Sequence, residues 1–191
     1  MDVRKTEAKD WMLLKQVRLA ALINTPTAFG VSYETAAKYT NEQWQERASA
    51  PAGPEFWLAF VDGKSVGMIG GVVSRTNRYN LIGMWVEPSM RGSGVASTLV
   101  EAVKSRALQK GYDQIFLDVS PDNERAASFY LKQGFVFIDE HEPLASHPHI
   151  TVQTMVWAAN GDVEQGTHHA LEEAGSPLAH PLSPRSSGVH D

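Results

Sequence analysis

Hydrophobic and polar positions repeat with two different periods along this chain, and the period changes from one segment to the next. Near the start, apolar residues recur every three or four positions, which is the spacing of one buried helix face. Asp10 precedes this run and Thr25 and Pro26 follow it, so we expect a capped helix between them. Thr40 and Gln43 form a capping box, which predicts a second helix that ends near residue 51. The apolar positions of the first helix are Leu13, Leu14, Val17 and Ala21.

The middle of the chain changes to apolar and β-branched segments that are typical of strands. Three such segments cover residues 56–61, 65–73 and 79–86. Asp62 and Gly63 stand between the first two, and Asp-Gly is a preferred hairpin turn. We therefore expect an antiparallel meander of three strands.

Helix and strand patterns alternate after the meander. Apolar residues return at helical spacing from residue 97 to 110, and Gly111 follows as a C-terminal cap. The next short strand covers residues 115–119, so strand, helix and strand form a right-handed crossover between two parallel strands. This order predicts an α/β fold with a mixed sheet.

One more helix and two closing strands complete the pattern. The helix is expected to begin near Pro121 or Asp122 and to stop at Gly134. The strands are expected at residues 135–138 and 150–157, with a loop over residues 140–149 between them.

A glycine turn joins the third strand of the meander to the helix behind it. Gly92 and Gly94 let successive backbone N–H groups point at one location, and the positive end of the helix dipole adds to them. This pattern is typical of a binding site for phosphate groups. A plain strand-to-helix turn is the alternative interpretation.

The residues after Gly94 narrow the choice of cofactor. A P-loop requires Lys and then Ser or Thr where Val95 and Ala96 stand, so ATP and GTP are not expected. A dinucleotide fingerprint requires glycine or alanine where Ser97 stands, so that fingerprint is only partly matched.

Together, these motifs resemble the GNAT superfamily of acyl-CoA-dependent N-acyltransferases. The superfamily signature is matched by Arg91, Gly94 and Ala96. A later superfamily pattern is matched by Asn123, Ala126, Tyr130, Gly134 and Phe135. The resemblance covers residues 1–158 and is strongest over residues 85–137. It implies the GNAT fold, a central and largely antiparallel sheet with a parallel strand-helix-strand crossover at the acetyl-CoA site.

The resemblance also implies roles for individual residues. The strand that carries Val86 would diverge from the strand that ends near Asp118, and its free backbone groups would bind the pantetheine arm. Tyr130 would donate a hydrogen bond to the departing CoA sulfur, with a purely structural place in the core as its alternative. Asn123 would bind pantetheine or cap the start of a helix. The implied diphosphate site consists of Arg91, Gly92, Ser93, Gly94, Val95, Ala96 and Ser97.

Composition and charge limit the alternatives. The 191 residues are 42% hydrophobic, which suits one soluble domain with a substantial core, expected over residues 1–158. Because the chain contains no cysteine, acyl transfer would be direct. Residues 160–191 hold five acidic residues and one arginine, so the body of the chain is nearly neutral and offers no basic stripe for nucleic acid.

Composition also gives expectations for the C-terminal segment and for the cellular compartment. Residues 159–191 are acidic and contain Pro, Ser and Gly without apolar periodicity, which predicts disorder. The first residues lack the apolar core of a signal peptide and no membrane span is evident, so a cytoplasmic protein with no membrane partner is expected. The oligomeric state is left open between a monomer and a homodimer.

The acceptor side of the site is less defined by the sequence. An alkylammonium is neutral at pH 7 in about one molecule in 2,500, which corresponds to roughly 4.6 kcal/mol, so a general base or a water chain is expected. The candidates for the base are Glu34, Glu87, Asp118 and Asp139. The acceptor is expected between residues 25–40 and the loop at 140–149, and aromatic residues of the first segment would form its walls or belong to the core. Those aromatic residues are Phe29, Tyr33 and Tyr39.

Three histidines, His141, His147 and His149, precede the last strand. Their spacing is not a recurring metal-ligand pattern, so no metal is expected, and one of them would instead line the acceptor pocket.

The expected function is N-acetyltransfer from acetyl-CoA to a primary amine of a small molecule. A peptide or protein amine is the alternative acceptor. A non-catalytic acyl-CoA-binding regulatory module and an interaction domain that uses the acidic tail are the alternatives from other classes.

Overall fold

A computed structural model describes residues 1–163 of the chain, and within them a seven-stranded sheet carries helices on both faces. The strands are β1 (Asp2–Lys5), β2 (Glu55–Val61), β3 (Lys64–Val73), β4 (Tyr79–Val86), β5 (Gln114–Val119), β6 (Val136–Leu144) and β7 (His147–Ala158). The helices are α1 (Trp11–Asn24), α2 (Tyr33–Ala37), α3 (Asn41–Ser49), α4 (Val95–Gln109) and α5 (Glu124–Lys132), with 3-10 turns η1 (Ala8–Asp10) and η2 (Pro88–Met90).

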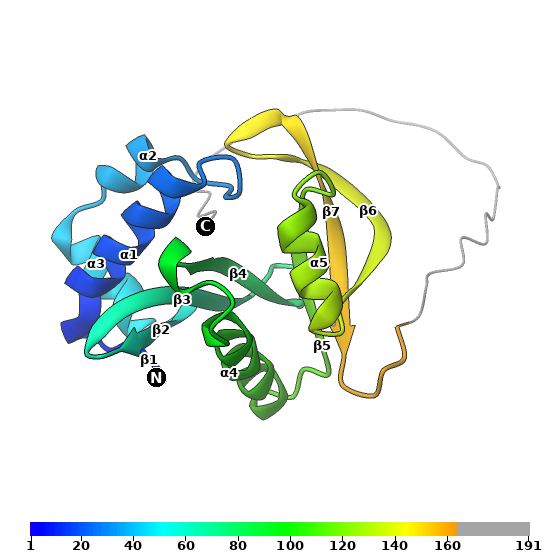
Figure 1. Cartoon of the computed structure of the whole chain (residues 1–191), viewed down its shortest axis with the longest axis horizontal. Helices are drawn as coiled ribbons and strands as arrows, with labels where there is room; N and C mark the ends of the chain where they lie inside the picture. The colour runs from blue at the N-terminus through cyan, green and yellow to red at the C-terminus, as the bar shows by residue number, and fades with distance from the viewer. Residues whose placement is uncertain (164–191) are drawn as a thin grey trace, which may run out of the picture.

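The strand order in the sheet is β1-β2-β3-β4-β5-β7-β6. Among the described strands, β4 and β5 form the one parallel pair, and α4 connects them as a crossover (Figure 1). The other neighbours are antiparallel. This topology confirms the predicted fold class.

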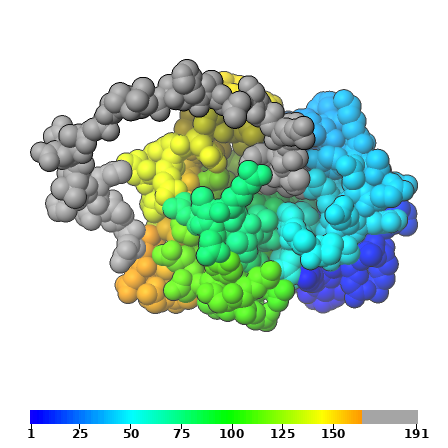
Figure 2. All heavy atoms as spheres, turned by 180° about the vertical axis from the view of Figure 1, so that it is seen from behind, coloured from blue at the N-terminus to red at the C-terminus, as the bar shows by residue number. Residues whose placement is uncertain are grey.

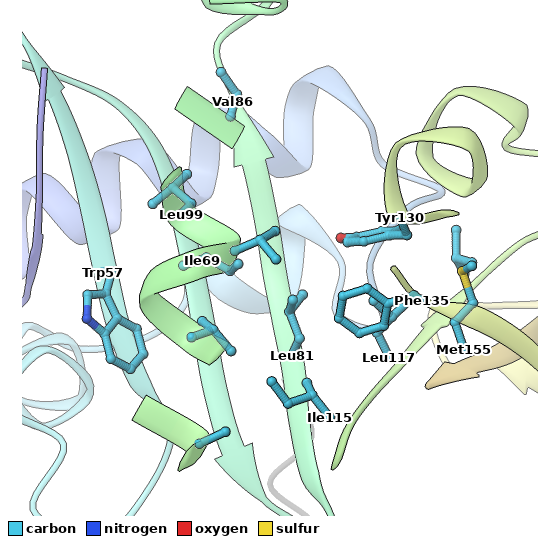
Figure 3. Close-up of a cluster of buried hydrophobic side chains, with 14 of the residues drawn as sticks. Trp57, Ile69, Leu81, Val86, Leu99, Ile115, Leu117, Tyr130, Phe135 and Met155 are labelled. Atoms are coloured by element: carbon cyan, nitrogen blue, oxygen red, sulfur yellow. The ribbon is translucent and has the colours of Figure 1, made fainter. Parts of the chain in front are cut away.

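Two hydrophobic clusters lie on opposite faces of the sheet. Phe56 and Leu58 pack under α1 and α3, whereas Trp57 and Ala59 pack under α4. Because successive strand residues point to opposite faces and both faces are covered, β2 is apolar from Phe56 to Val61 rather than alternating with polar residues. Figure 3 shows the second cluster, with Leu99 of α4 close to the side chains of the sheet.

Figure 2 shows the molecule from behind, with the N-terminal helices (blue to cyan) on one side and the closing strands (yellow to orange) on the other. The segments in the middle of the chain lie between them. This part of the fold contains β4 and the start of α4, where the glycine turn is located.

The predicted turns are present. Asp62 and Gly63 both have positive φ, 50° and 76°, as a two-residue type I′ hairpin requires. Gly111 has a φ of 85° directly after the end of α4. These residues end the elements where their conformations predict.

Two elements are present that the sequence pattern does not indicate. β1 is a four-residue edge strand of charged and apolar residues, and its hydrogen bonds to β2 hold it in place without an apolar pattern of its own. α2 is a single short turn whose start is capped by Ser32, which accepts a hydrogen bond from the Thr35 N–H.

The loop predicted over residues 140–149 is wrong. β6 continues to Leu144 and β7 begins at His147, so the segment is the tip of a hairpin. The two strands pair there with shifted registers near Pro143, which hides the usual alternation of apolar and polar residues.

Two helix starts also differ in detail. Asp10 occupies the N-cap position of α1 but makes no capping hydrogen bond there, because its carboxylate accepts hydrogen bonds from Arg4 at 2.8 and 2.9 Å and from the Glu7 N–H. α5 begins at Glu124, later than predicted from Pro121 and Asp122.

The described chain ends soon after β7, whose last residue is Ala158. The segment predicted to be disordered, residues 159–191, lies outside the described residues from position 164 onward. Across residues 1–163, the helices are too short or too polar to cross a membrane.

Candidate functional site

β4 and β5 separate after a single pair of aligned residues. Asn80 is paired with Phe116, but β4 continues for six more residues, to Val86, while β5 continues along β7. The second half of β4 therefore has no strand beside it on the β5 side of the described sheet. Backbone groups on that edge are available to a ligand that lies along the strand, and this divergence confirms the sequence prediction.

A β-bulge lies in the diverging part of β4. Met68 pairs with Trp85 and Gly70 pairs with Ile82, so two residues of β4 stand opposite one residue of β3. Gly83 is one of the two residues and has a φ of 58°. A bulge of this kind turns backbone groups away from the ladder. A glycine inside the strand is the sequence signal that indicates it.

The glycine turn after β4 forms an open cradle. Gly92 and Gly94 have φ values of 79° and 89°, and a Cβ built on either would meet no atom within 4 Å. The first N–H of α4 to find a helical partner is that of Thr98, which donates to the Gly94 carbonyl at 3.1 Å. The N–H groups of residues 95–97 precede it and have no partner in the helix. This geometry suits an anion.

The side chains of the cradle residues have different surroundings. The Ser93 hydroxyl and N–H both donate to the Met90 carbonyl, so they face the turn itself. The Ser97 hydroxyl accepts a hydrogen bond from Gln133 at 3.0 Å and thereby connects α4 to α5. Val95 is buried and fixes the first turn of the helix in the core.

Arg91 is held at the end of β4. Its Nε donates to the Val86 carbonyl at 3.2 Å, and its Nη2 donates to Asn24 Oδ1 at 3.0 Å. Asn24 also accepts a hydrogen bond from the Trp85 indole at 3.1 Å. These bonds position the guanidinium beside the cradle, next to the Val86 backbone.

A second positive charge lies near Arg91. Burial lowers the pKa of Arg91, and the charge of Arg125 at the start of α5 lowers it further. Two like charges repel each other, and an anion between them would relieve that repulsion. Nothing in the sequence pattern singles out Arg125.

Tyr130 lies on α5 with its ring packed in the core. The ring makes edge-to-face contacts with Phe129 and Phe135 at centroid distances of 5.3 and 5.7 Å. In Figure 3 its hydroxyl oxygen points away from Phe135 and toward the side of β4. The hydroxyl makes no hydrogen bond within residues 1–163. Burial raises the pKa of Tyr130 above its ordinary value, so at neutral pH the group donates a proton in a hydrogen bond and does not ionise.

Asn123 caps α5. Its Oδ1 accepts a hydrogen bond from the Ala126 N–H at 3.2 Å. Of the two roles expected from the sequence, helix capping is the one with a visible contact, and contact with pantetheine stays a prediction.

The candidate general bases lie on separate parts of the fold. Glu34 is exposed on α2, Glu87 is exposed after the end of β4, and Asp139 is exposed on β6. Asp118 on β5 accepts a hydrogen bond from Thr154 at 2.7 Å. The structure does not gather these carboxylates, so none is distinguished as the base.

The three histidines lie on the β6–β7 hairpin. His147 Nδ1 is 2.9 Å from the Ser146 hydroxyl, and its ring is 5.9 Å from that of His149. His141 Nδ1 is 3.5 Å from an Asp139 oxygen. Across the described part of the chain, no three His, Asp or Glu side chains form a group that could hold a metal ion.

The two segments expected to flank the acceptor do meet. Ser146 at the hairpin tip donates a hydrogen bond to the Phe29 carbonyl, in the connection between α1 and α2. Phe29 is buried, and its ring lies 4.8 Å from the guanidinium of Arg18. Tyr39 contacts Trp44 edge to face, whereas Tyr33 is exposed. Phe29 and Tyr39 therefore belong to the edge of the core.

Known proteins share this sequence pattern and fold. A family model described as the acetyltransferase (GNAT) family matches residues 19–135. N-acetyltransferase 8 of Homo sapiens is 32% identical over 88 residues, which are 44% of this chain and 39% of that protein. The chain thus spans well under half the length of that relative.

Solved structures share the fold at lower identity. A GNAT-family acetyltransferase from Streptococcus pneumoniae superposes with a TM-score of 0.67 at 21% identity, covering 82% of this chain and 98% of that one. An acetyltransferase from Bacillus anthracis, solved in complex with acetyl coenzyme A, superposes with a TM-score of 0.52 at 19% identity, covering 58% of this chain and 65% of that one.

Proposed function

Because the chain belongs to the GNAT acetyltransferase family, we propose that it transfers the acetyl group of acetyl-CoA directly to a primary amine of a small molecule. The observation that carries the proposal is the cradle of residues 92–97 at the end of the diverging strand β4. It combines unpaired N–H groups, a helix N-terminus and two arginines at one location, which together suit a diphosphate.

Two parts of the site would bind the acyl donor, acetyl-CoA. The N–H groups of residues 94–97 and the Arg91 guanidinium would hold the diphosphate, with Arg125 adding positive charge. The free edge of β4 near Val86 would hydrogen-bond to the amides of the pantetheine arm, as an added strand does. The bulge at Gly83 supplies backbone groups turned away from the ladder, where the thioester carbonyl would lie.

Chemistry follows from these positions. The amine nitrogen attacks the thioester carbonyl carbon, a C–N bond forms, the C–S bond breaks, and CoA leaves as the thiolate, which then takes up a proton from water. A backbone N–H of β4 would stabilise the negative charge that develops on the carbonyl oxygen. Tyr130 would donate a hydrogen bond to the sulfur as it leaves. The proton of the attacking amine would pass to water in the open end of the site. Direct transfer is consistent with a chain that has no cysteine.

The test is an incubation of the purified protein with acetyl-CoA and a panel of amines, read by release of free thiol. Acetyl transfer to one or more small amines, and weaker transfer to peptide N-termini and lysine side chains, is the expected result. Gly94→Val should slow it at sub-saturating acetyl-CoA, and Gly63→Val, which alters a glycine of positive φ in a distant hairpin, is the matched control. Tight binding of CoA with no transfer to any amine would instead indicate a regulatory module.

A further inference from the structure

One buried positive charge is not used by the proposed reaction. Arg18 on α1 is only 6% exposed, and its Nη1 has no hydrogen-bond partner in the described part of the chain. Three other arginines, Arg4, Arg78 and Arg106, pair with carboxylates at 2.8, 2.6 and 3.1 Å. A buried charge without a counter-ion destabilises the folded state. An anionic ligand could therefore supply the counter-charge and the hydrogen-bond acceptor that Arg18 lacks among the described residues.

A second cationic side chain, Arg47, lies close to Arg18. Burial, and after it the nearby charge of Arg47 on α3, lowers the pKa of Arg18 to about 10. The group is still protonated at neutral pH. The guanidinium lies 4.8 Å from the centre of the Phe29 ring, and Arg47 lies over Tyr39 at 4.3 Å. A cation–π contact stabilises a buried guanidinium less than an ion pair does, so an anion would be the better partner for Arg18.

A small cavity opens at this point. It is lined by Leu14, Tyr39, Trp44, Arg47 and Met68 together with Arg18, and has a volume of about 10 Å³. That is room for about one water molecule. One carboxylate oxygen is about the size of that water molecule.

The cavity lies next to the reacting end of the proposed site. A Cβ built on Gly83, at the β4 bulge, would be 3.4 Å from Arg18 Nη1. Arg18 also contacts Phe29, whose carbonyl is held by the tip of the β6–β7 hairpin. Arg18 thus belongs to the sheet face of α1 and α3, opposite the face on which Tyr130 packs.

We propose that Arg18, with Arg47 beside it, binds a carboxylate of the acceptor, so that the acceptor is an amine bearing a free carboxylate, such as an amino acid. This inference rests on the proposed N-acetyltransfer and names its substrate class. The carboxylate would dock at the cavity while the amine reaches the thioester at the bulge. Because both points adjoin Gly83, the amine and the carboxylate are separated by few bonds.

The test compares each of the common amino acids with its carboxamide and with its decarboxylated amine. Compared with the amino acid, the carboxamide has a less basic amine and the decarboxylated compound has a more basic amine. A change in amine basicity therefore cannot explain a lower kcat/KM for both analogues. For at least one amino acid, kcat/KM should exceed that of both analogues by about 10- to 100-fold, the value of a hydrogen bond to a charged group. Equal kcat/KM across each set would overturn the inference and leave the proposed function intact.

Variants identify the residue responsible. Arg18→Met should remove the preference for the carboxylate without raising KM for acetyl-CoA, and Arg47→Gln should weaken it. Arg75→Gln changes an exposed arginine in the β3–β4 turn and should keep the preference. Arg18→Met removes an unpartnered buried charge, so we expect it to fold. A preference that persists in Arg18→Met would also refute the assignment.

A binding readout separates the two proposals. The N-acetyl derivative of each amino acid, added without CoA, should raise the thermal midpoint of the wild-type chain but not that of Arg18→Met. If no amine releases thiol and this stabilisation is still observed, the carboxylate site stands and N-acetyltransfer fails. If neither effect is observed with any compound, the carboxylate site is refuted as well.

Discussion

Replacing Tyr130 with phenylalanine tests the proposed chemistry with little disturbance to the fold. The substitution keeps the ring, and the ring makes the edge-to-face contacts with Phe129 and Phe135 at 5.3 and 5.7 Å. It removes a hydroxyl that has no hydrogen-bond partner in the described chain. The free energy of unfolding should therefore change by no more than about 0.5 kcal/mol.

The expected effect on the rate follows from proton affinities. The pKa of a thiol is about 8.5 and that of a tyrosine about 10, so full proton transfer to the thiolate is unfavourable by roughly 2 kcal/mol. Burial raises the pKa of Tyr130 and enlarges this difference. On the proposed mechanism, the hydroxyl would therefore act as a hydrogen-bond donor to the leaving sulfur and not as a full acid. A hydrogen bond to a charged group contributes about 1.5–3 kcal/mol, so kcat should fall about 10- to 150-fold in Tyr130→Phe.

The assay is thiol release at saturating acetyl-CoA, with the amine that the panel identifies. Tyr112→Phe is the matched control, because its hydroxyl donates to Asn77 at 2.8 Å on the surface and its removal should leave kcat unchanged. The raised pKa of Tyr130 means that its neutral, donating form persists as the pH rises, so its contribution to kcat should not decline between pH 7 and about pH 9. An unchanged kcat in Tyr130→Phe, with acetylation intact, would refute the role of this hydroxyl.

Substitutions at three further positions test other parts of the structure. Gly94→Val places a β-branched residue at a φ of 89°, which should destabilise the fold by roughly 1–3 kcal/mol and weaken acetyl-CoA binding at least tenfold by calorimetry; unchanged affinity would exclude the cradle. Burial raises the pKa of Glu55, but hydrogen bonds from three cationic side chains outweigh it and lower that pKa to about 2, so wild-type stability should decline as the pH falls from 4.5 to 2. Glu55→Gln should be less stable by roughly 2–3 kcal/mol at pH 7 in urea unfolding and should show a smaller decline, because Asp10 and Glu140, whose pKa values are also lowered, still contribute to it; an identical pH dependence in both would contradict the ion-pair assignment. Asn123→Ala should lose about 1 kcal/mol of unfolding free energy and Asn123→Asp should retain it, whereas equal loss in both would argue against capping.

The sequence predicts the parts of this fold whose local chemistry is decisive. The Asp62–Gly63 turn and the glycine after α4 require positive φ, and both lie where the pattern places them. The crossover between β4 and β5 follows from a strand, an amphipathic helix and a second strand in succession. These features depend on residues close together in the chain.

Features that depend on distant contacts are not visible in the sequence. β1 is defined by its pairing with β2 rather than by its own residues, and the β6–β7 hairpin extends through segments that contain Pro143 and Pro148. Both are held by ladder hydrogen bonds, which leave no periodic pattern when the strand is short or its register shifts.

The candidate site likewise contains some residues that local sequence motifs identify and others that only the tertiary fold identifies. Gly92, Gly94 and Tyr130 occur in motifs that can be recognised along the chain, and their geometry suits the proposed roles. Arg125 and Arg18 cannot be recognised in this way, because a helical arginine is ordinarily exposed and only the tertiary fold decides that one lies beside Arg91 and the other beneath Phe29.

A crystal structure of the complex with acetyl-CoA tests the central claim most directly. The account predicts diphosphate oxygens about 3 Å from N–H groups in residues 92–97, and the sulfur within hydrogen-bond reach of the Tyr130 hydroxyl. A ligand lodged at any other part of the molecule, with the glycine turn unoccupied in crystals that contain acetyl-CoA, would contradict it.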